Sequence, residues 1–277
     1  MRWVLLVLFP CFLFGEQPPH DGVRLLWDTT FLSRRPAAGP AAAPYAAVAG
    51  LSTESFVGVT VWRLRPSTSA DNPGVRLLAH TEPGSRQWTP VRVGADSPLA
   101  EGDRVRISIE TARPGYLYVI DREQYAGRVL GDPVLIFPTS RLRGGNNRVR
   151  PGALVELPGW DDHPPYWRLR RARPDHVGEM LTILVTPRPI PGLITGDEAI
   201  RLDPQRVAAW EKRWDATVER LEAPHQAGRP YSAAEKQAAR NAAQLLTPDD
   251  PAPQTLFRVE ARPDQPLLVN LPLRIRN

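Results

Sequence analysis

Alternation of apolar and polar residues is the strongest pattern in this chain, and it extends over residues 56–186. In residues 56–65 (FVGVTVWRLR), three valines occupy one face, while Phe56, Trp62 and Leu64 occupy the other. Successive side chains of a β-strand point to opposite faces. The pattern therefore predicts a strand that packs on both faces or lies near the edge of a sheet.

Two further segments predict strands of different kinds. In residues 104–110 (RVRISIE), one valine and two isoleucines alternate with charged and polar residues, which predicts one face towards a core and the other towards water. Residues 116–120 (YLYVI) are apolar on both faces, which predicts a central strand. Between them, Pro114 and Gly115 are typical of a type II turn.

The remaining strand candidates are short and separated by turn residues. They lie at residues 75–79, 88–93, 134–137, 153–157, 166–169 and 180–186. Short strands at this spacing favour a mainly β fold, an antiparallel β-sandwich or barrel-like domain, over residues 51–190.

Residues 191–277 predict a two-helix insertion followed by a C-terminal β-hairpin, all packed on the β-domain. Asp203 and Pro204 suit the start of a helix. Its apolar positions recur every three or four residues, at Val207, Trp210, Trp214, Val218 and Leu221. Ser232 and Glu235 form a capping box before a second, alanine-rich helix. Residues 255–261 and 267–275 predict the arms of the hairpin.

The first fifty residues predict an export signal and an arm. Residues 1–15 combine Arg2, an apolar run and a polar break, which is the layout of a secretory signal peptide. The bulky residues before Cys11, the only cysteine, disfavour lipid attachment there. Residues 16–50 predict an extended arm or linker, and Trp27 and Phe31 could plug into the main domain. We therefore expect a periplasmic or extracellular protein with no stable membrane span in the mature chain.

Composition excludes one class of partner and gives little else. The net charge is +5, and Arg supplies nearly all of the positive charge. Nucleic-acid binding needs basic residues clustered on one face, and the sequence gives no sign of such clustering. We expect no nucleic-acid partner.

Several segments taken together resemble a known family. EGDRVRI, GYLYVIDRE, LIFPT, NNRVRPG and GEMLTILVTPRPI follow one another within residues 56–190. This succession resembles the bacterial Domain of Unknown Function 4384, a module of exported proteins that is sometimes fused to kinase-like or caspase-like domains. The resemblance implies an exported β-domain. The family offers no catalytic residues to carry over.

One group of residues stands out as a candidate binding site. Four arginines and two asparagines surround Gly144 and Gly145, whose backbone tolerates left-handed conformations. The group consists of Arg141, Arg143, Asn146, Asn147, Arg148 and Arg150. Guanidinium groups beside outward-turned amides suit a phosphate or carboxylate, although solvated arginines on a hairpin are the favoured explanation. We expect an anionic polymer or an acidic partner here.

The other candidates have simpler structural explanations. Residues 161–163 (DDH) offer metal ligands, but three adjacent residues face one ion with difficulty. His80 and His176 are single histidines, and no G-x-S-x-G elbow accompanies them. Tyr116 with Tyr118, and Trp210 with Trp214, could stack on rings of a ligand, but packing explains both pairs.

Two classes of function remain. The first is an extracytoplasmic, non-catalytic binding or protein-interaction module without catalytic residues, metal or cofactor, whose partner is an envelope protein or an anionic polymer. The alternative is a cell-envelope hydrolase with unrecognised catalytic residues. A pocket with converging titratable groups would favour the hydrolase, whereas a shallow arginine-lined or aromatic surface would favour binding.

Overall fold

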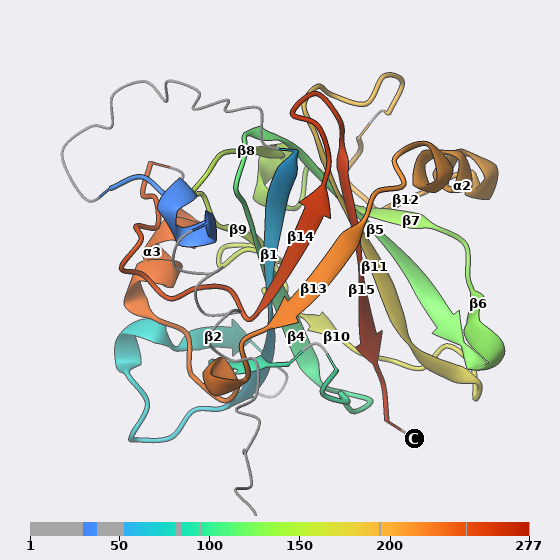
Figure 1. Cartoon of the computed structure of the whole chain (residues 1–277). Helices are drawn as coiled ribbons and strands as arrows, with labels where there is room; N and C mark the ends of the chain where they lie inside the picture. Colours follow the sequence, from blue (N-terminus) through green and yellow to red (C-terminus); the bar gives the residue numbers. More distant parts are fainter. Residues whose placement is uncertain are drawn as a thin grey trace, which may run out of the picture.

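The computed structural model describes residues 30–37, 53–80, 85–94, 96–193, 195–241 and 243–276. Over these ranges the chain folds into two antiparallel sheets packed face to face (Figure 1). Each sheet runs from one edge strand to another, so the fold is a β-sandwich, as the alternation predicts. The expected signal peptide and Trp27 lie outside the described residues.

The first sheet has eight strands and is built around one long strand. Its strands are β1 (Glu54–Pro66), β2 (Leu77–His80), β3 (Ser85–Val93), β4 (Arg104–Thr111), β9 (Val155–Leu157), β10 (Trp167–Arg168), β13 (Val218–Glu222) and β14 (Thr255–Glu260). The order is β10-β4-β1-β14-β13, with β9 beside β4. One half of β1 pairs with β14 and the other half with β3, and β2 pairs with β3 in turn.

The second sheet has seven strands. They are β5 (Gly115–Tyr125), β6 (Val129–Leu130), β7 (Val134–Phe137), β8 (Arg148–Val149), β11 (His176–Thr186), β12 (Ile200–Arg201) and β15 (Leu267–Arg274). The order is β12-β7-β5-β11-β15, while the short strands β6 and β8 both pair with β5. The central place of β5 confirms the prediction from its two apolar faces.

The core lies between the sheets. Val57 and Val59 of β1 and Ile107 of β4 meet Val119 of β5 and Ile183 of β11 in one apolar cluster, and all five are fully buried. Each comes from an alternating position of its strand. This packing explains why β-branched residues dominate these positions.

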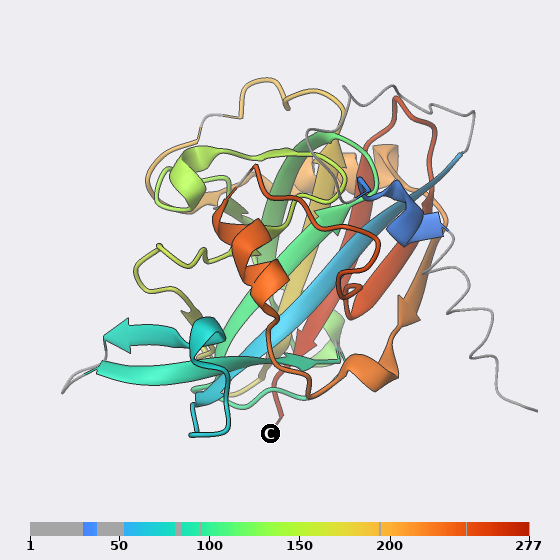
Figure 2. The ribbon, with the colours of Figure 1, turned by 90° about the vertical axis from the view of Figure 1, so that its left-hand side faces the viewer.

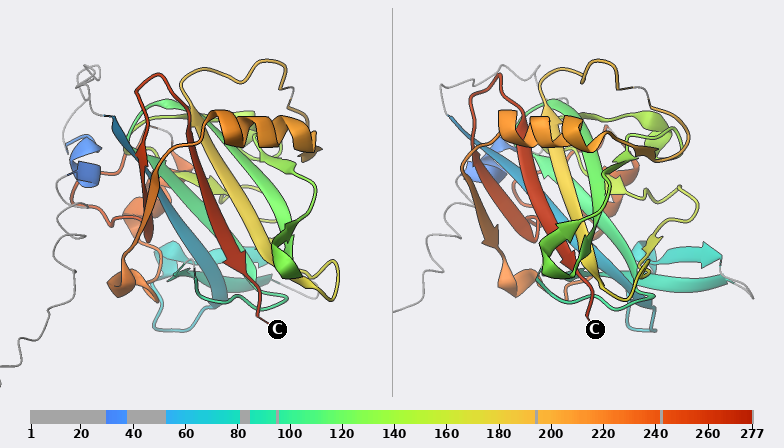
Figure 3. Two further views of the ribbon diagram at one scale, coloured as in Figure 1. Left: turned by 45° about the vertical axis from the view of Figure 1, so that its right-hand side comes forward. Right: turned by 90° about the vertical axis from the view of Figure 1, so that its right-hand side faces the viewer.

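Helices and loops cover the outer faces of both sheets (Figures 2 and 3). The described residues form the short 3₁₀ helices η2 (Leu32–Arg34), η3 (Pro73–Val75), η4 (Ala126–Arg128), η5 (Arg143–Gly145) and η6 (Pro224–Gln226), and the α-helices α2 (Pro204–Arg213) and α3 (Ala233–Arg240). Helix α2 packs on the second sheet, where Val207 contacts the cluster around Tyr118 and Leu184. Helix α3 lies over the first sheet, and the predicted capping box of Ser232 and Glu235 is present.

The described part of the N-terminal arm packs on the sandwich. Phe31 is buried against Phe56 of β1 and Leu256 of β14, as part of a second apolar cluster. The sequence predicted that Phe31 could insert into the main domain, and this contact confirms that prediction for Phe31.

The prediction of one continuous helix through Leu221 is wrong. Helix α2 begins at the predicted cap, where Asp203 accepts a hydrogen bond from the Gln205 N–H, but it ends at Arg213. Residues 218–222 form β13 and pair with β14. Thr217 and Val218 are β-branched and favour extended backbone, and β14 offers an unpaired edge, so strand pairing prevails over helical periodicity.

The predicted C-terminal hairpin is also wrong in its pairing. Both strands exist, but β14 pairs with β1 and β13 in the first sheet, whereas β15 pairs with β11 in the second. Each strand turns an apolar face into the core, including Val259 of β14 and Val269 of β15. The turn between them therefore crosses from one sheet to the other, which alternation alone cannot distinguish from a hairpin.

Candidate functional site

The predicted arginine loop is built into the second sheet. The Asn147 side-chain amide donates to the Leu117 carbonyl at 3.0 Å, and the Asn147 carbonyl accepts from the Leu117 N–H at 2.8 Å. Arg143 has a φ of 53° and donates from Nη1 to the Leu154 carbonyl at 3.1 Å. Burial lowers the pKa of Arg143. Asn147 and Arg143 thus hold the loop in place.

The other members of the predicted set have separate surroundings. The Arg148 guanidinium lies 5.6 Å from the centre of the Tyr116 ring, and Asn146 Oδ1 accepts from the Arg148 N–H at 3.2 Å. Arg141 lies 3.4 Å from an exposed glutamate, and Arg150 is exposed. The structure brings Arg148 and Asn146 together but gives each of Arg141, Arg143 and Arg148 a different neighbour.

The DDH segment is a capped turn. Asp162 Oδ2 accepts from the Gly159 N–H at 2.6 Å, and Asp161 lies 3.3 Å from Arg240. Over the described residues, no three His, Cys, Asp or Glu side chains are grouped so that they could hold a metal ion.

The predicted aromatic pairs pack against the second sheet. The Trp210 and Trp214 rings stack with centres 5.6 Å apart and planes 14° from parallel, and both are half-buried beside Val207. The Tyr118 hydroxyl accepts from the Ile190 N–H at 3.0 Å. Packing is therefore a sufficient role for these residues.

A hollow that the sequence did not indicate opens at one end of the sandwich. Its volume is about 440 Å³, and it lies where β5 and β15 end and β11 begins. Figure 3 shows the end of β15 close to the turn that follows β5. The hollow is lined by Pro98, Gln124, Tyr125, Ala126, Gly127, Arg128, Val177, Arg274, Ile275 and Arg276.

Three exposed arginines give the hollow its charge. They are Arg128, Arg274 and Arg276. Their guanidinium groups form no ion pair or hydrogen bond with the described residues, whereas exposed Arg141, Arg173 and Arg201 each pair with a carboxylate. Arg128 also has a φ of 65°, a left-handed backbone conformation that residues other than glycine rarely adopt. Strained backbone of this kind concentrates at functional sites.

Tyr125 forms a wall of the hollow and connects it to the interior. Its hydroxyl donates to Glu123, and its ring lies 5.8 Å from the His176 ring. The Arg173 guanidinium covers the same tyrosine ring at 4.3 Å and pairs with Asp175 at 2.8 Å. The wall is thus fixed from both sides.

Carboxyl groups lie behind this wall and carry unusual pKa values. Burial, and then the Glu123 charge, raise the pKa of Asp121 to about 7. Burial, then Asp121 and Glu123, raise the pKa of Glu179 to about 9. Glu179 is therefore protonated at neutral pH, which limits the negative charge behind the hollow.

His176 has a structural role beside this cluster. Its Nδ1 accepts from the Ala172 N–H at 3.2 Å, so the ring proton sits on Nε2. Nε2 then donates to the Gly178 carbonyl at 2.7 Å and lies 3.3 Å from Glu179. An Nδ1 occupied by a backbone N–H is not available to accept a proton from a nucleophile.

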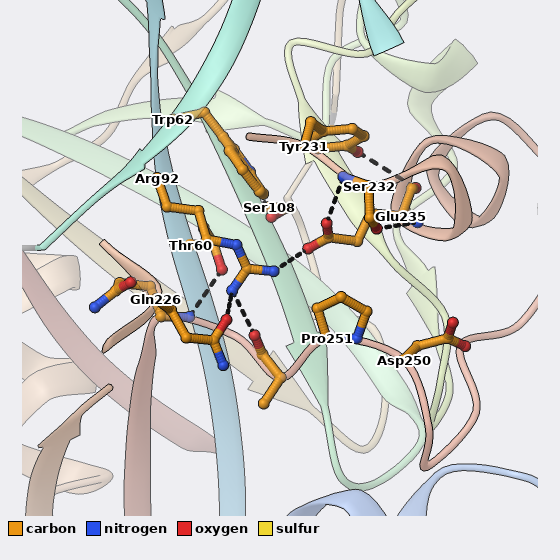
Figure 4. Close-up of polar contacts among 12 residues, drawn as sticks. Thr60, Trp62, Arg92, Ser108, Gln226, Tyr231, Ser232, Glu235, Asp250 and Pro251 are labelled. Atoms are coloured by element: carbon orange, nitrogen blue, oxygen red, sulfur yellow. Dashed lines mark hydrogen bonds and ion pairs between the residues drawn. The ribbon is translucent and has the colours of Figure 1, made fainter. Parts of the chain in front are cut away.

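A second set of polar residues lies buried on the outer face of the first sheet (Figure 4). Arg92 of β3 donates to Gln226, to the Ala252 carbonyl at 2.6 Å and to Glu235 of α3. The Arg92 and Glu235 side chains are 1% and 5% exposed, so this ion pair fastens α3 to the sheet out of contact with water.

Two similar ion pairs lie in the same layer. Arg35 pairs with Glu110 at 2.7 Å, and Arg106 pairs with Glu156 at 2.9 Å. The Arg106 nitrogens have no well-aligned acceptor, but its guanidinium lies 4.7 Å from the Trp160 ring centre. Burial raises the pKa of Glu156 to about 7, although Arg106 opposes the shift.

The expectation that the polar face of β4 meets water is wrong. Arg106, Ser108 and Glu110 are 0%, 3% and 2% exposed, because η2, α3 and the loops beside it cover this face. The space left under the cover is about 10 Å³, next to Arg35 and Glu235. That is room for about one water molecule, so the layer is structural and not a ligand pocket.

No family model, curated protein or solved structure matches this chain. The resemblance to Domain of Unknown Function 4384 stays an expectation. No helix in the described ranges is long and apolar enough to cross a membrane.

Proposed function

We propose that this protein is an extracytoplasmic, non-catalytic binding module that holds an anionic group of its partner in the hollow between β5, β11 and β15. The observation that carries this proposal is the set of three exposed guanidinium groups, Arg128, Arg274 and Arg276, around one concave surface. Guanidinium groups recognise carboxylates and phosphates through paired hydrogen bonds. Residues 1–15, with the layout of a signal peptide, support a place outside the cytoplasm.

The arrangement favours binding over catalysis. The hollow is open, and the polar side chains that line it are three arginines, Gln124 and Tyr125, with no carboxylate or histidine among them. Catalysis by a histidine base would need a free ring nitrogen, whereas both nitrogens of His176 are engaged. The supported chemistry is therefore recognition of negative charge.

Binding of poly-glutamate and of inorganic phosphate, measured by calorimetry at low and high salt, tests the proposal. We expect the wild type to bind poly-glutamate, and to bind it more weakly as salt rises. Arg274→Ser combined with Arg276→Ser should weaken binding at least about tenfold, the loss expected when charge-assisted hydrogen bonds are removed.

Arg128→Gly gives a sharper comparison, because glycine relieves the left-handed backbone while removing the charge. This variant should keep or gain stability and still lose affinity. Arg143→Gly is the control for backbone conformation, since Arg143 also has a positive φ. It loses the hydrogen bond to the Leu154 carbonyl as well, so its thermal unfolding is measured alongside its affinity. Unchanged affinity in Arg128→Gly with reduced affinity in Arg143→Gly would move the site to the loop, and no binding of any anion by the wild type would overturn the proposal.

One observation favours the alternative, an envelope hydrolase. Asp121 and Glu179 share a buried site with raised pKa values, and such pairs serve as general acids in many enzymes. Turnover of chromogenic esters, glycosides or cell-wall fragments that Asp121→Asn abolishes would establish this function instead.

A further inference from the structure

The rim of the hollow carries apolar residues that the fold does not use. Val129 and Leu130 of β6 follow Arg128 directly and are 58% and 37% exposed, two of the four large apolar side chains with such exposure in the described ranges. Strand β6 pairs with β5 on one side and with no other described strand. Contiguous exposed apolar residues with a polar rim mark interaction surfaces more often than isolated ones do.

We infer that the ligand of the hollow is an extended protein segment in which an acidic residue lies next to a large apolar residue. The inference rests on the proposed function and adds the class of partner. The acidic group faces Arg128, Arg274 and Arg276, while the apolar side chain covers Val129 and Leu130.

Charge and shape favour a peptide over a lipid surface. The arginines surround a concave space, which suits a projecting side chain, whereas a bilayer is matched by a flat or convex basic face. Gln124, with a donor and an acceptor on one amide, lies in the same hollow and can meet the donors and acceptors of a peptide backbone.

The probes are labelled hexapeptides measured by fluorescence anisotropy. One alternates aspartate with leucine, a second replaces each leucine with serine, and a third replaces each aspartate with asparagine. We expect the first to bind at least about fivefold more tightly than the second, as the loss of partly buried apolar contact implies. The third should bind no more tightly than the second.

Variants of the protein locate each contact. Val129→Ser combined with Leu130→Ser should bring the first peptide to the affinity of the second and leave the second unchanged. Val218→Ser is the matched control, because Val218 is 40% exposed on β13 in the other sheet. Since all these residues are exposed, thermal unfolding should be unchanged.

The outcomes separate this inference from the proposed function. Equal affinity for the leucine and serine peptides, both lost in Arg274→Ser with Arg276→Ser, would overturn the apolar contact and keep the anion site. Binding to phosphatidylglycerol vesicles but to none of the peptides would overturn the peptide partner in favour of a lipid surface. No binding to any anionic probe would overturn both.

Discussion

The Arg35 guanidinium and the Glu110 carboxylate form a two-pronged ion pair, with Nε to Oε1 and Nη2 to Oε2 both at 2.7 Å, and their side chains are 1% and 2% exposed. Arg35 also donates to the carbonyls of Thr247, Asp250 and Pro251. One side chain of the N-terminal segment thus joins β4 to the loop that follows α3.

This arrangement predicts unequal costs for the two halves of the pair. Arg35→Ala should lower the free energy of unfolding by about 3–5 kcal/mol, because it leaves a buried carboxylate and three carbonyls without their donor. Glu110→Ala should cost less, since Arg35 keeps its three carbonyl partners. Urea denaturation measures both, and equal costs would show that the carbonyl contacts contribute nothing.

The stacked tryptophans of α2 predict a moderate loss of stability. Truncating a fully buried tryptophan costs about 3–5 kcal/mol, and Trp214 is half-buried, so we expect about 2 kcal/mol for Trp214→Ala. Lys212→Ala, at an exposed position of the same helix, should change stability by less than about 0.5 kcal/mol. An unchanged melting temperature for Trp214→Ala would mean that the pair is free for a ligand.

The buried carboxyl groups predict that stability falls as pH rises. Asp121 and Glu179 have pKa values of about 7 and about 9 in the folded protein, above the ordinary values of 3.8 and 4.5. The folded state therefore binds more protons than the unfolded state, so their contribution is fully present at acidic pH and is lost as pH rises through those two values. The melting temperature should therefore decline as the pH is raised from about 5 to about 9.

Replacing these groups isolates their share of the pH dependence. Glu179→Gln keeps the shape and removes the titration, so its melting temperature should decline less steeply with pH than that of the wild type. A wild-type profile that rises between neutral and alkaline pH would contradict the assignment.

The backbone of Leu273 lies so close to Gly178 that we expect any side chain at Gly178 to be destabilising. A Cβ added there would lie 2.2 Å from the Leu273 carbonyl oxygen, at the point where β11 meets β15. Gly178→Ala should cost about 1–3 kcal/mol because the two strands must separate. Gly196→Ala is the control, since open space surrounds that position. Similar stability of the two variants would show that the strands shift freely.

Strands could be predicted from the sequence because period-two alternation is a local property. Residues 116–120 show this well, since two apolar faces predicted the central place that β5 occupies. The capping box of Ser232 and Glu235 was equally readable, because its contacts span only three residues. Residues 218–222 were misread because a short apolar repeat fits a helix and a strand, and only the distant partner β14 decides between them.

The environment of the charges could not be predicted in the same way. Arg106 and Glu110 alternate with apolar residues as solvent-facing side chains do, and the layer that buries them comes from far along the chain. The hollow likewise combines Arg128 with Arg274 and Arg276, which only the pairing of β11 with both β5 and β15 brings together. The spacing of residues along the sequence cannot predict that these three arginines lie close together.

The pairing of Glu54 in β1 with Glu260 in β14 has a consequence for how the chain folds. Neither sheet is complete until β14 and β15 are in place, and both follow every other strand of the described residues in sequence. Without β14 and β15, residues 54–59 of β1 lack one pairing partner and β11 keeps one unpaired edge. Contacts this distant in sequence form slowly because a long loop must close first, so we expect these pairings to be late steps of folding.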